Sequence, residues 1–263
     1  KKNYYSKLEK KQKPILLFAN DNNTLIIADN IAKYYALDIN TGDLLWSKNN
    51  SAPFNSQIKI YNNKFFVVDF DNILRAYSVK DGEELWNVKT EKTLIRSQKK
   101  MSMVIIDQKI YFNNSVGDIS AVDINDGQLL WQRPTQNSLI IDQAFSLKTS
   151  DIIADRKSLY LSNNKNEFFS IDIDTGDLNW KQKINSNLRS TLIDNYIFSV
   201  SLEGYLIIIE KKSGNIVRST NIFSFKKNKK NRRNLLTGKI ITGKNSINAK
   251  PVGFIVGSSD IYV

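Results

Sequence analysis

Two residue types are missing from this 263-residue chain, which contains no cysteine and no histidine. The absence of cysteine excludes a disulfide, a thiolate metal site and a cysteine nucleophile within these residues. The absence of histidine removes the commonest catalytic base and metal ligand. No apolar run reaches the roughly 18 residues that a membrane-spanning helix needs. We therefore expect neither the familiar Cys- or His-based active sites nor a membrane-spanning segment.

Acidic residues are fewer than basic ones: the chain has 26 Asp and Glu residues against 38 Lys and Arg residues, and its net charge is +12. An excess of this kind can indicate binding to nucleic acid or to an anionic membrane. Here lysine supplies most of the excess and is spread along the whole chain together with abundant Ile and Asn. This distribution favours a general compositional bias, and we expect no nucleic-acid partner.

Two local basic clusters stand out, over residues 1–13 and 226–233. Such runs are most often solvated loops or tails. We interpret residues 1–14 as a basic linker that ends at Pro14. For residues 226–233 three interpretations remain open: a disordered connection, a contact with acidic lipid headgroups or an acidic partner, and nucleic-acid binding. The absence of interleaved aromatic residues disfavours the last of these.

The strongest feature of the sequence is a repeated pattern, Ala-x-Asp-x-x-x-Gly-x-x-x-Trp, whose first copy runs from Ala36 to Trp46. All four tryptophans of the chain stand four residues after a motif glycine, which chance placement does not explain. A fifth copy keeps the glycine but has Glu210 in the Asp position and Arg218 in the Trp position. The motif residues are Ala36, Asp38, Gly42 and Trp46; Ala76, Gly82 and Trp86; Ala121, Asp123, Gly127 and Trp131; Ser170, Asp172, Gly176 and Trp180; and Gly214.

The motif glycines are 40, 45, 49 and 38 residues apart, a period of about 43 that is typical of propeller blades. Short segments rich in β-branched and aromatic residues, separated by Asn-, Asp- and Gly-rich turns, predict four strands per unit. In the first unit these are 15–19, 24–28, 34–39 and 44–48, and 252–257 and 260–263 begin a sixth, uncompleted unit. The segments 92–100 and 135–149 interrupt the pattern as insertions. We therefore predict an all-β propeller of four-stranded antiparallel blades over 15–263, with little helix, five blades and part of a sixth.

Each motif residue type has a physical role in this architecture. Gly42 accepts the positive φ that a tight hairpin turn requires, and Asp38 can accept backbone N–H groups within the turn. A carboxylate that returns in each good repeat is a poor candidate for catalysis, because an active site needs only one or two. The small residue six positions before the glycine leaves room for an indole ring. We therefore interpret the Ala and the Trp as partners between adjacent blades.

The motif resembles the tryptophan-docking motif of the PQQ-like (pyrroloquinoline-quinone-like) β-propeller repeats, over about residues 15–263. The resemblance implies a ring that is commonly eight-bladed, in which each Trp stacks over the Ala/Gly backbone of the next blade. One branch of that superfamily comprises quinone- and Ca²⁺-dependent dehydrogenases, which typically stack the quinone against a disulfide. The other comprises non-enzymatic scaffolds of the BamB type, propeller lipoproteins of the outer-membrane β-barrel assembly machinery. Compact blades and the absence of Cys favour the scaffold branch, with no cofactor, and the dehydrogenase branch remains the alternative.

The scaffold branch implies a periplasmic, outer-membrane-associated protein that acts as a monomer within a complex. Its partner would be the barrel-inserting subunit, which such scaffolds contact through loops between mid-ring blades. By position in the repeat, the similar residues here are Leu147, Lys148, Leu188 and Arg189. The match is partial, because Lys148 stands where the family has Arg and no paired acidic residues accompany Arg189. An ordinary polar connection between blades remains the other interpretation of both loops.

Overall fold

The computed structural model describes residues 2–90, 99–135, 149–163, 166–223, 232–233, 240–241, 251–257 and 261–262. Both insertions lie largely outside these residues, at 91–98 and 136–148. Leu147 and Lys148 therefore lie outside the described residues. The same is true of residues 224–231, which include most of the second basic cluster.

Five four-stranded antiparallel sheets follow one another along the chain, and in each the strands are hydrogen-bonded in chain order. Blade 1 contains β1 (Leu16–Asp21), β2 (Thr24–Asp29), β3 (Lys33–Asp38) and β4 (Leu44–Asn49). Blade 2 contains β5 (Lys59–Tyr61), β6 (Lys64–Val68), β7 (Ile73–Ser78) and β8 (Glu84–Lys89). Blade 3 contains β9 (Met103–Ile106), β10 (Lys109–Asn113), β11 (Ile119–Asp123) and β12 (Leu129–Arg133).

Blade 4 contains β13 (Ile153–Ala154), β14 (Ser158–Ser162), β15 (Glu167–Asp172) and β16 (Leu178–Lys183). Blade 5 contains β17 (Thr191–Ile193), β18 (Tyr196–Val200), β19 (Tyr205–Glu210) and β20 (Ile216–Asn221). Two short ladders follow, β21 (Arg232–Arg233) with β22 (Ile240–Ile241) and β23 (Ile255–Val256) with β24 (Ile261–Tyr262). The all-β propeller prediction is confirmed, and β23 and β24 lie within the two strands expected to begin a sixth unit.

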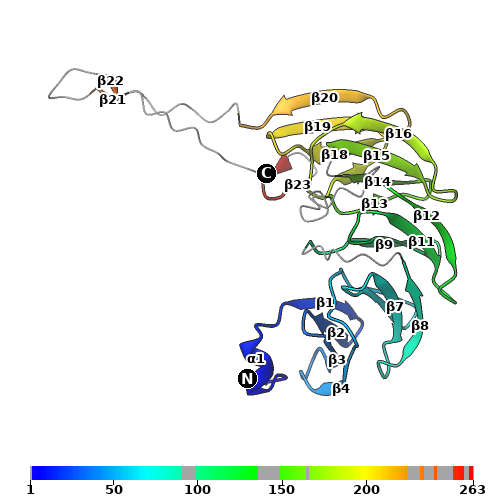
Figure 1. The fold of residues 1–263 in the computed structure, drawn as a ribbon. Helices are drawn as coiled ribbons and strands as arrows, with labels where there is room; N and C mark the ends of the chain where they lie inside the picture. The colour runs from blue at the N-terminus through cyan, green and yellow to red at the C-terminus, as the bar shows by residue number, and fades with distance from the viewer. Residues whose placement is uncertain are drawn as a thin grey trace.

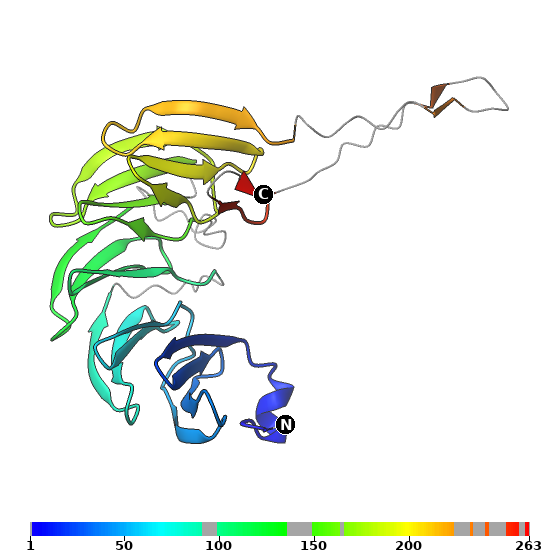
Figure 2. The ribbon, with the colours of Figure 1, turned by 180° about the vertical axis from the view of Figure 1, so that it is seen from behind.

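The five blades are arranged side by side along an open arc (Figure 1). The first strands of the blades, such as β1, β9 and β13, lie toward the concave side, whereas β8, β12 and β16 lie along the convex rim. The view from behind shows the same curved stack, with blade 1 and blade 5 at its two ends (Figure 2). This arrangement places both faces of the central blades against neighbouring sheets.

The hydrophobic core is built between blades. The middle strands β2 and β3 are buried along most of their length, so their side chains contact neighbours on both faces of the sheet. One cluster joins Tyr34 of blade 1 to Phe65 and Tyr77 of blade 2. The Tyr34 and Tyr77 ring centroids are 4.7 Å apart, and those of Phe65 and Tyr77 are 5.0 Å apart. Aromatic pairs at such distances add to the burial of apolar area, so each blade is stabilised by the next.

The motif turns have the geometry that their residue types favour. Gly42 has a φ of +67°, and its N–H donates to the carbonyl of Asp38 over 2.8 Å. The carboxylate Oδ1 of Asp38 accepts the N–H groups of Asn40 and Thr41, each over 2.8 Å. A register shift after Ala36 marks a β-bulge between β3 and β4, and the last two strands of the other four blades carry the same shift. The bulge and the positive φ reverse the chain within four residues of the Asp.

The tryptophan of one blade lies on the motif glycine of the next. A Cβ added to Gly82 would be 2.6 Å from the Trp46 ring, well inside van der Waals contact. The Trp46 indole N–H donates to the carbonyl of Val79 in the same turn, over 3.0 Å. Only a residue without a side chain allows this approach. The pairs are Trp46–Gly82, Trp86–Gly127, Trp131–Gly176 and Trp180–Gly214.

The predicted pairing of Trp with Ala between blades requires a correction. Ala36 and Trp46 are register partners on β3 and β4 of the same blade. The surface that the neighbouring blade offers to the ring is the motif glycine and the backbone beside it. The small residue is needed because Ala36 is fully buried beside the indole within its own sheet.

A second feature recurs at a constant spacing in this chain. It lies at the turn between the second and third strands of each blade. Thirteen residues before each motif glycine stands a buried Asp, Asn or Ser: Asp29, Asp69, Asn114, Asn163 and Ser201. Asp69 Oδ1, for example, accepts the N–H groups of Asp71 and Ile73 over 2.9 and 3.0 Å. Short polar side chains cap turns in this way. The spacing is visible in the sequence, although these residues lie outside the Ala-x-Asp-x-x-x-Gly-x-x-x-Trp motif.

The N-terminal segment is bound to blade 1, in contrast to the linker predicted over residues 1–14. Residues Lys7–Lys11 form helix α1, which begins with a capping box between Ser6 and Glu9. The Tyr4 hydroxyl donates to the carbonyl of Gly42 over 2.6 Å. The Tyr5 hydroxyl donates to the buried carboxylate of Asp29 over 2.6 Å. This segment covers the motif turn of blade 1, where the other motif turns are covered by a tryptophan.

Candidate partner-binding face

Because consecutive strands of a blade are antiparallel, the two ends of each blade carry different turns and connections. One end, which we call the motif face, carries the motif turns and the turns between first and second strands. In blade 4 these two turns are joined by a bond from the Ile173 N–H to the Lys157 carbonyl, over 3.1 Å. The other end, the connection face, carries the chain segments that lead from one blade to the first strand of the next. Of the sequence-predicted partner residues, Leu188 and Arg189 belong to this connection face.

Leu188 and Arg189 lie in the connection between β16 and β17, where Leu188 is half-buried and Arg189 is exposed. The connection is fixed on both sides of them, since Ile184, Ser186 and Ser190 are buried. The Ser186 hydroxyl also donates to the carbonyl of Val200 over 2.8 Å. Arg189 is thus an exposed cation on a segment that is held in place by its neighbours.

The charge of Arg189 acts on a residue of another blade, Lys59. Lys59, the first residue of β5, has a pKa below its ordinary value because of burial and then because of the nearby Arg189 guanidinium. Asp151, which precedes β13, acts in the opposite direction on Lys59. The side-chain amide of Gln57 donates to Asp151 Oδ2 over 3.0 Å. The connection face therefore carries charged residues of blades 2, 4 and 5 that act on one another electrostatically, which no motif in the sequence indicated.

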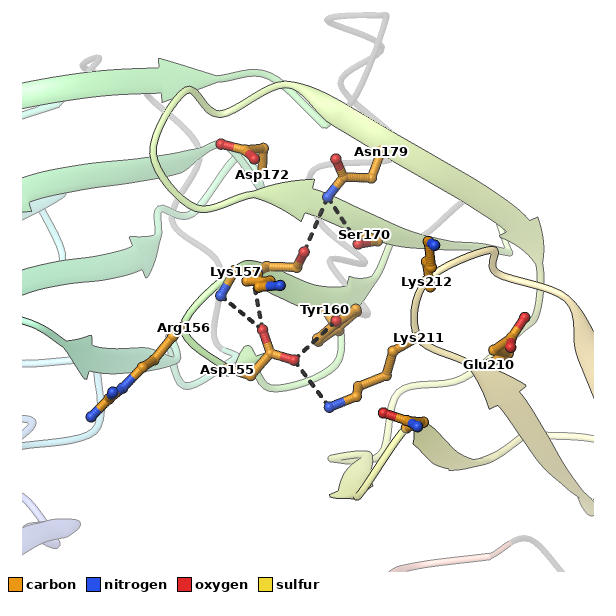
Figure 3. A pocket seen from close by; sticks show the side chains of 12 residues that line it. Asp155, Arg156, Lys157, Tyr160, Ser170, Asp172, Asn179, Glu210, Lys211 and Lys212 are labelled. Carbon is orange, nitrogen blue, oxygen red and sulfur yellow. Dashed lines mark hydrogen bonds and ion pairs between the residues drawn. The ribbon is translucent and has the colours of Figure 1, made fainter.

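The motif face has a polar pocket of about 940 Å³ between blades 4 and 5 (Figure 3). At its centre, Asp155 Oδ2 accepts the Tyr160 hydroxyl over 3.2 Å and forms an ion pair with Lys211 over 3.2 Å. Burial raises the pKa of Asp155, but the N–H groups of Lys157 and Ser158 and the Lys211 ammonium outweigh it and lower the pKa. An ionised Asp155 therefore ties blade 4 to blade 5, and we assign this network a structural role.

The residues that the structure describes hold neither a candidate membrane-spanning helix nor a cluster of potential metal ligands. No helix among them is long and apolar enough to cross a membrane. Within the same part of the chain, no group of three or more His, Cys, Asp and Glu side chains is placed to hold a metal ion.

Repeated four-stranded blades, a Gly–Trp contact at each junction and the Asp-capped turn define a β-propeller of the PQQ-like class. A family model described as "Outer membrane protein assembly factor BamB" matches residues 6–220. The match covers most of the chain, and the chain belongs to this family. No curated protein sequence matches it.

Solved structures of this fold include both branches of the superfamily. BamB from Moraxella catarrhalis is similar with a TM-score of 0.63 and 16% identity, over 78% of this chain and 63% of that one. Quinohemoprotein alcohol dehydrogenase from Comamonas testosteroni gives a TM-score of 0.60 and 14% identity, over 78% and 42%. A europium-containing methanol dehydrogenase gives a TM-score of 0.63 and 14% identity, over 79% and 52%. The chain thus spans less than two thirds of the length of these proteins, and the likeness establishes the fold.

Proposed function

We propose that this protein is a non-enzymatic periplasmic scaffold, associated with the outer membrane, that assists the assembly of β-barrel proteins through protein contacts. The observation that carries the proposal is the match of residues 6–220 to the family of outer-membrane assembly factors. The partner we propose is the barrel-inserting subunit of that machinery. The protein acts as a monomer within the complex and uses no cofactor.

The connection between blades 4 and 5 supports this proposal. Exposed Arg189 and half-buried Leu188 offer a charge beside an apolar group, and buried neighbours on both sides hold the backbone that presents them. A surface that is ordered before binding loses little conformational entropy when a partner docks. Leu147 and Lys148 belong to the same proposed contact on sequence grounds alone.

The experiment is co-purification of the tagged protein with the separately expressed periplasmic domains of the barrel-inserting subunit. We expect a stable complex of one copy of each protein by size-exclusion chromatography with light scattering. Absence of a complex at micromolar concentrations would contradict the proposed partner.

The alternative branch, a quinone-dependent dehydrogenase, is favoured by the likeness to dehydrogenase structures at comparable TM-scores. Adding the quinone together with Ca²⁺ separates the two functions. A ligand present at 100 times its Kd stabilises the folded state by about 2.7 kcal/mol. We expect an unchanged melting temperature, and a clear rise would favour the dehydrogenase branch.

A peripheral membrane contact through residues 226–233 is a further part of the proposal, based on sequence alone. Attraction of clustered Lys and Arg to anionic lipid weakens with salt. Salt-sensitive retention on anionic vesicles that disappears when the run is neutralised would support this contact. Retention that is unchanged in the neutralised variant would contradict it.

A further inference from the structure

Side chains of one blade contact the motif turn of the next in three ways. The docking tryptophan lies on the motif glycine. In the part of the chain that the structure describes, three junctions also carry a donor from the preceding blade to the glycine carbonyl: Tyr34 to Gly82 over 3.1 Å, Arg133 to Gly176 over 2.8 Å and Gln182 to Gly214 over 2.8 Å. At two of these junctions, a cation two residues after the tryptophan pairs with the acidic residue after the glycine, as Lys48–Glu83 and Arg133–Asp177.

The motif turn of blade 1 receives the second and third of these contacts from the N-terminal segment of the same chain. The Tyr4 hydroxyl donates to the Gly42 carbonyl over 2.6 Å. The Lys2 ammonium pairs over 2.6 Å with Asp43, the acidic residue after the glycine. An aromatic residue and a cation two positions apart thus meet the turn, in the reverse of the sequence order found in the outermost strands. We call residues 2–5 the N-terminal cap.

The N-terminal cap fills the turn of blade 1 less closely than a tryptophan fills the other turns. The nearest atom to a Cβ added at Gly42 is the Tyr4 hydroxyl, at 3.5 Å, whereas at Gly82 it is the Trp46 ring, at 2.6 Å. The turns themselves are alike, since the two glycines have φ values of +67° and +70°. The blade 1 turn therefore has the backbone shape of a blade junction and is covered by a smaller substitute.

Beside the turn, the N-terminal cap covers an apolar surface on the face of blade 1 that points away from blade 2. Tyr4 and Tyr5 pack on Tyr35, with ring centroids 5.7 and 5.9 Å apart. Ile27 is buried in the same cluster and is the register partner of both Tyr35 and Phe18. Register partners share a face of the sheet, and Phe18 is 71% exposed. Removal of the cap would join these residues in one exposed apolar patch, and such patches favour association.

The surface that fits this patch lies at the other end of the arc, on a second copy of the chain (Figure 2). There the outermost strand of blade 5, β20, exposes Ile216 and Val217. Arg218 follows them, exposed, at the position that a docking tryptophan occupies in the other blades. Stacking of this end on blade 1 would place apolar residues against apolar ones and bring a cation to the end that carries the Asp43 carboxylate.

We propose that the N-terminal cap keeps a second copy of this chain from stacking its blade 5 end on blade 1. Terminal repeats of an array need a cover, because one of their faces is not buried by a neighbouring repeat. The contact would be head-to-tail and would not close, so uncapped molecules would form open chains. This role of the cap is independent of the barrel-inserting subunit as a partner.

Analytical ultracentrifugation of the whole chain over a concentration series tests the cap. K2E/Y4A/Y5A removes its contacts with blade 1, and the matched control K7E/L8A/K11A changes three exposed residues of α1. We expect the wild type and the control to remain monomeric. K2E/Y4A/Y5A should associate at least about tenfold more tightly, because two aromatic contacts and an ion pair no longer compete with the second copy. A synthetic peptide of residues 2–14, but not a scrambled one, should return this variant to the monomer.

The single substitution K2E is a milder variant that leaves the aromatic contacts in place, so it remains informative if the triple variant fails to fold. It places two carboxylates together at a pair whose side chains are 46% and 68% exposed. We expect association to increase about twofold to fivefold, as for the loss of an exposed ion pair, and K2R to behave like wild type.

Arg218→Glu, added to K2E/Y4A/Y5A, tests the surface on the second copy. It should weaken association at least about fivefold, because a carboxylate then faces the end that carries Asp43, whereas Arg156→Glu on the motif face should not. Three results would overturn the inference: a folded K2E/Y4A/Y5A that is as monomeric as wild type, association that the peptide does not reverse, or association that Arg218→Glu leaves unchanged. If the triple variant is unfolded, wild-type behaviour of K2E would overturn it as well.

Discussion

The ring of Trp46 lies so close to Gly82 that a methyl group on that glycine would be 2.6 Å from the ring carbon Cζ3. The tryptophan on the last strand of blade 1 thus contacts the motif turn of blade 2, and the same contact recurs at the next three junctions between blades. Because the contact joins separate sheets, its loss should affect the stability of the whole stack and not of one hairpin alone.

Gly82→Ala tests this contact, with Gly42→Ala as its matched control. Both glycines have positive φ, +70° and +67°, so both substitutions incur similar backbone strain of about 1 kcal/mol. At Gly42 the nearest atom to an added Cβ is the Tyr4 hydroxyl at 3.5 Å, which is ordinary contact. We expect Gly82→Ala to lower the free energy of unfolding by about 3–5 kcal/mol in urea, because the indole must leave its site. Equal losses for the two variants would contradict the account.

The indole N–H groups give a second comparison, between Trp131 and Trp86. Trp131 Nε1 donates to the carbonyl of Ile173 over 3.2 Å. Within the described residues, the buried Nε1 of Trp86 has no acceptor. Replacement by Phe keeps an aromatic ring and removes the N–H. We therefore expect Trp131→Phe to be more destabilising than Trp86→Phe by about 1 kcal/mol, measured by chemical denaturation. Equal destabilisation by the two substitutions, or a larger loss for Trp86→Phe, would contradict a net stabilising contribution of the Trp131 hydrogen bond.

Asp69 and Glu84 both bind Arg75, and we predict that substitution of Asp69 is the more destabilising of the two. The Asp69 carboxylate accepts two backbone N–H groups and the Nε–H of Arg75 over 2.8 Å, and it is fully buried. Asp69→Ala leaves a buried guanidinium without this partner and should cost about 3–5 kcal/mol. Glu84 binds the same Arg75 at 2.7 Å but is partly exposed, so Glu84→Ala should cost about 1 kcal/mol or less. Similar melting temperatures for the two variants would contradict this difference.

The N-terminal helix should respond to acid through Glu9. The Ser6 backbone N–H, and then the Lys33 ammonium, lower the Glu9 pKa from 4.5 to about 2. A carboxyl group with a lowered pKa in the folded state contributes stability above its unfolded pKa and loses it as pH falls through the folded pKa. The stability difference between wild type and Glu9→Gln should therefore be constant above about pH 5 and shrink between about pH 4.5 and pH 2. A difference that is independent of pH over this window would contradict the assignment.

The sequence was sufficient for the blades because Gly and Trp recur at a fixed offset and each fixes a turn or a junction. The same spacing rule extends to Asp69 and its counterparts, which stand thirteen residues before the motif glycines but vary among Asp, Asn and Ser. Helix α1 was missed because its Lys-rich segment has no apolar period, although Ser6 and Glu9 form a readable capping box. The charged residues of the connection face are different in kind. The charge of Arg189 acts on Lys59 only because the fold places their blades on one arc, and no local pattern in the sequence contains that geometry.

The most direct test of the scaffold account is a binding titration of the barrel-inserting subunit's periplasmic domains against Arg189→Glu. Arg156→Glu is the matched control, because Arg156 is an exposed arginine on the motif face with 86% of its side chain accessible. We predict that Arg189→Glu weakens binding at least about tenfold, as for a contact at the centre of an interface. Arg156→Glu should bind like wild type. Equal affinities for Arg189→Glu and wild type would contradict the assignment of the connection face as the partner-binding surface.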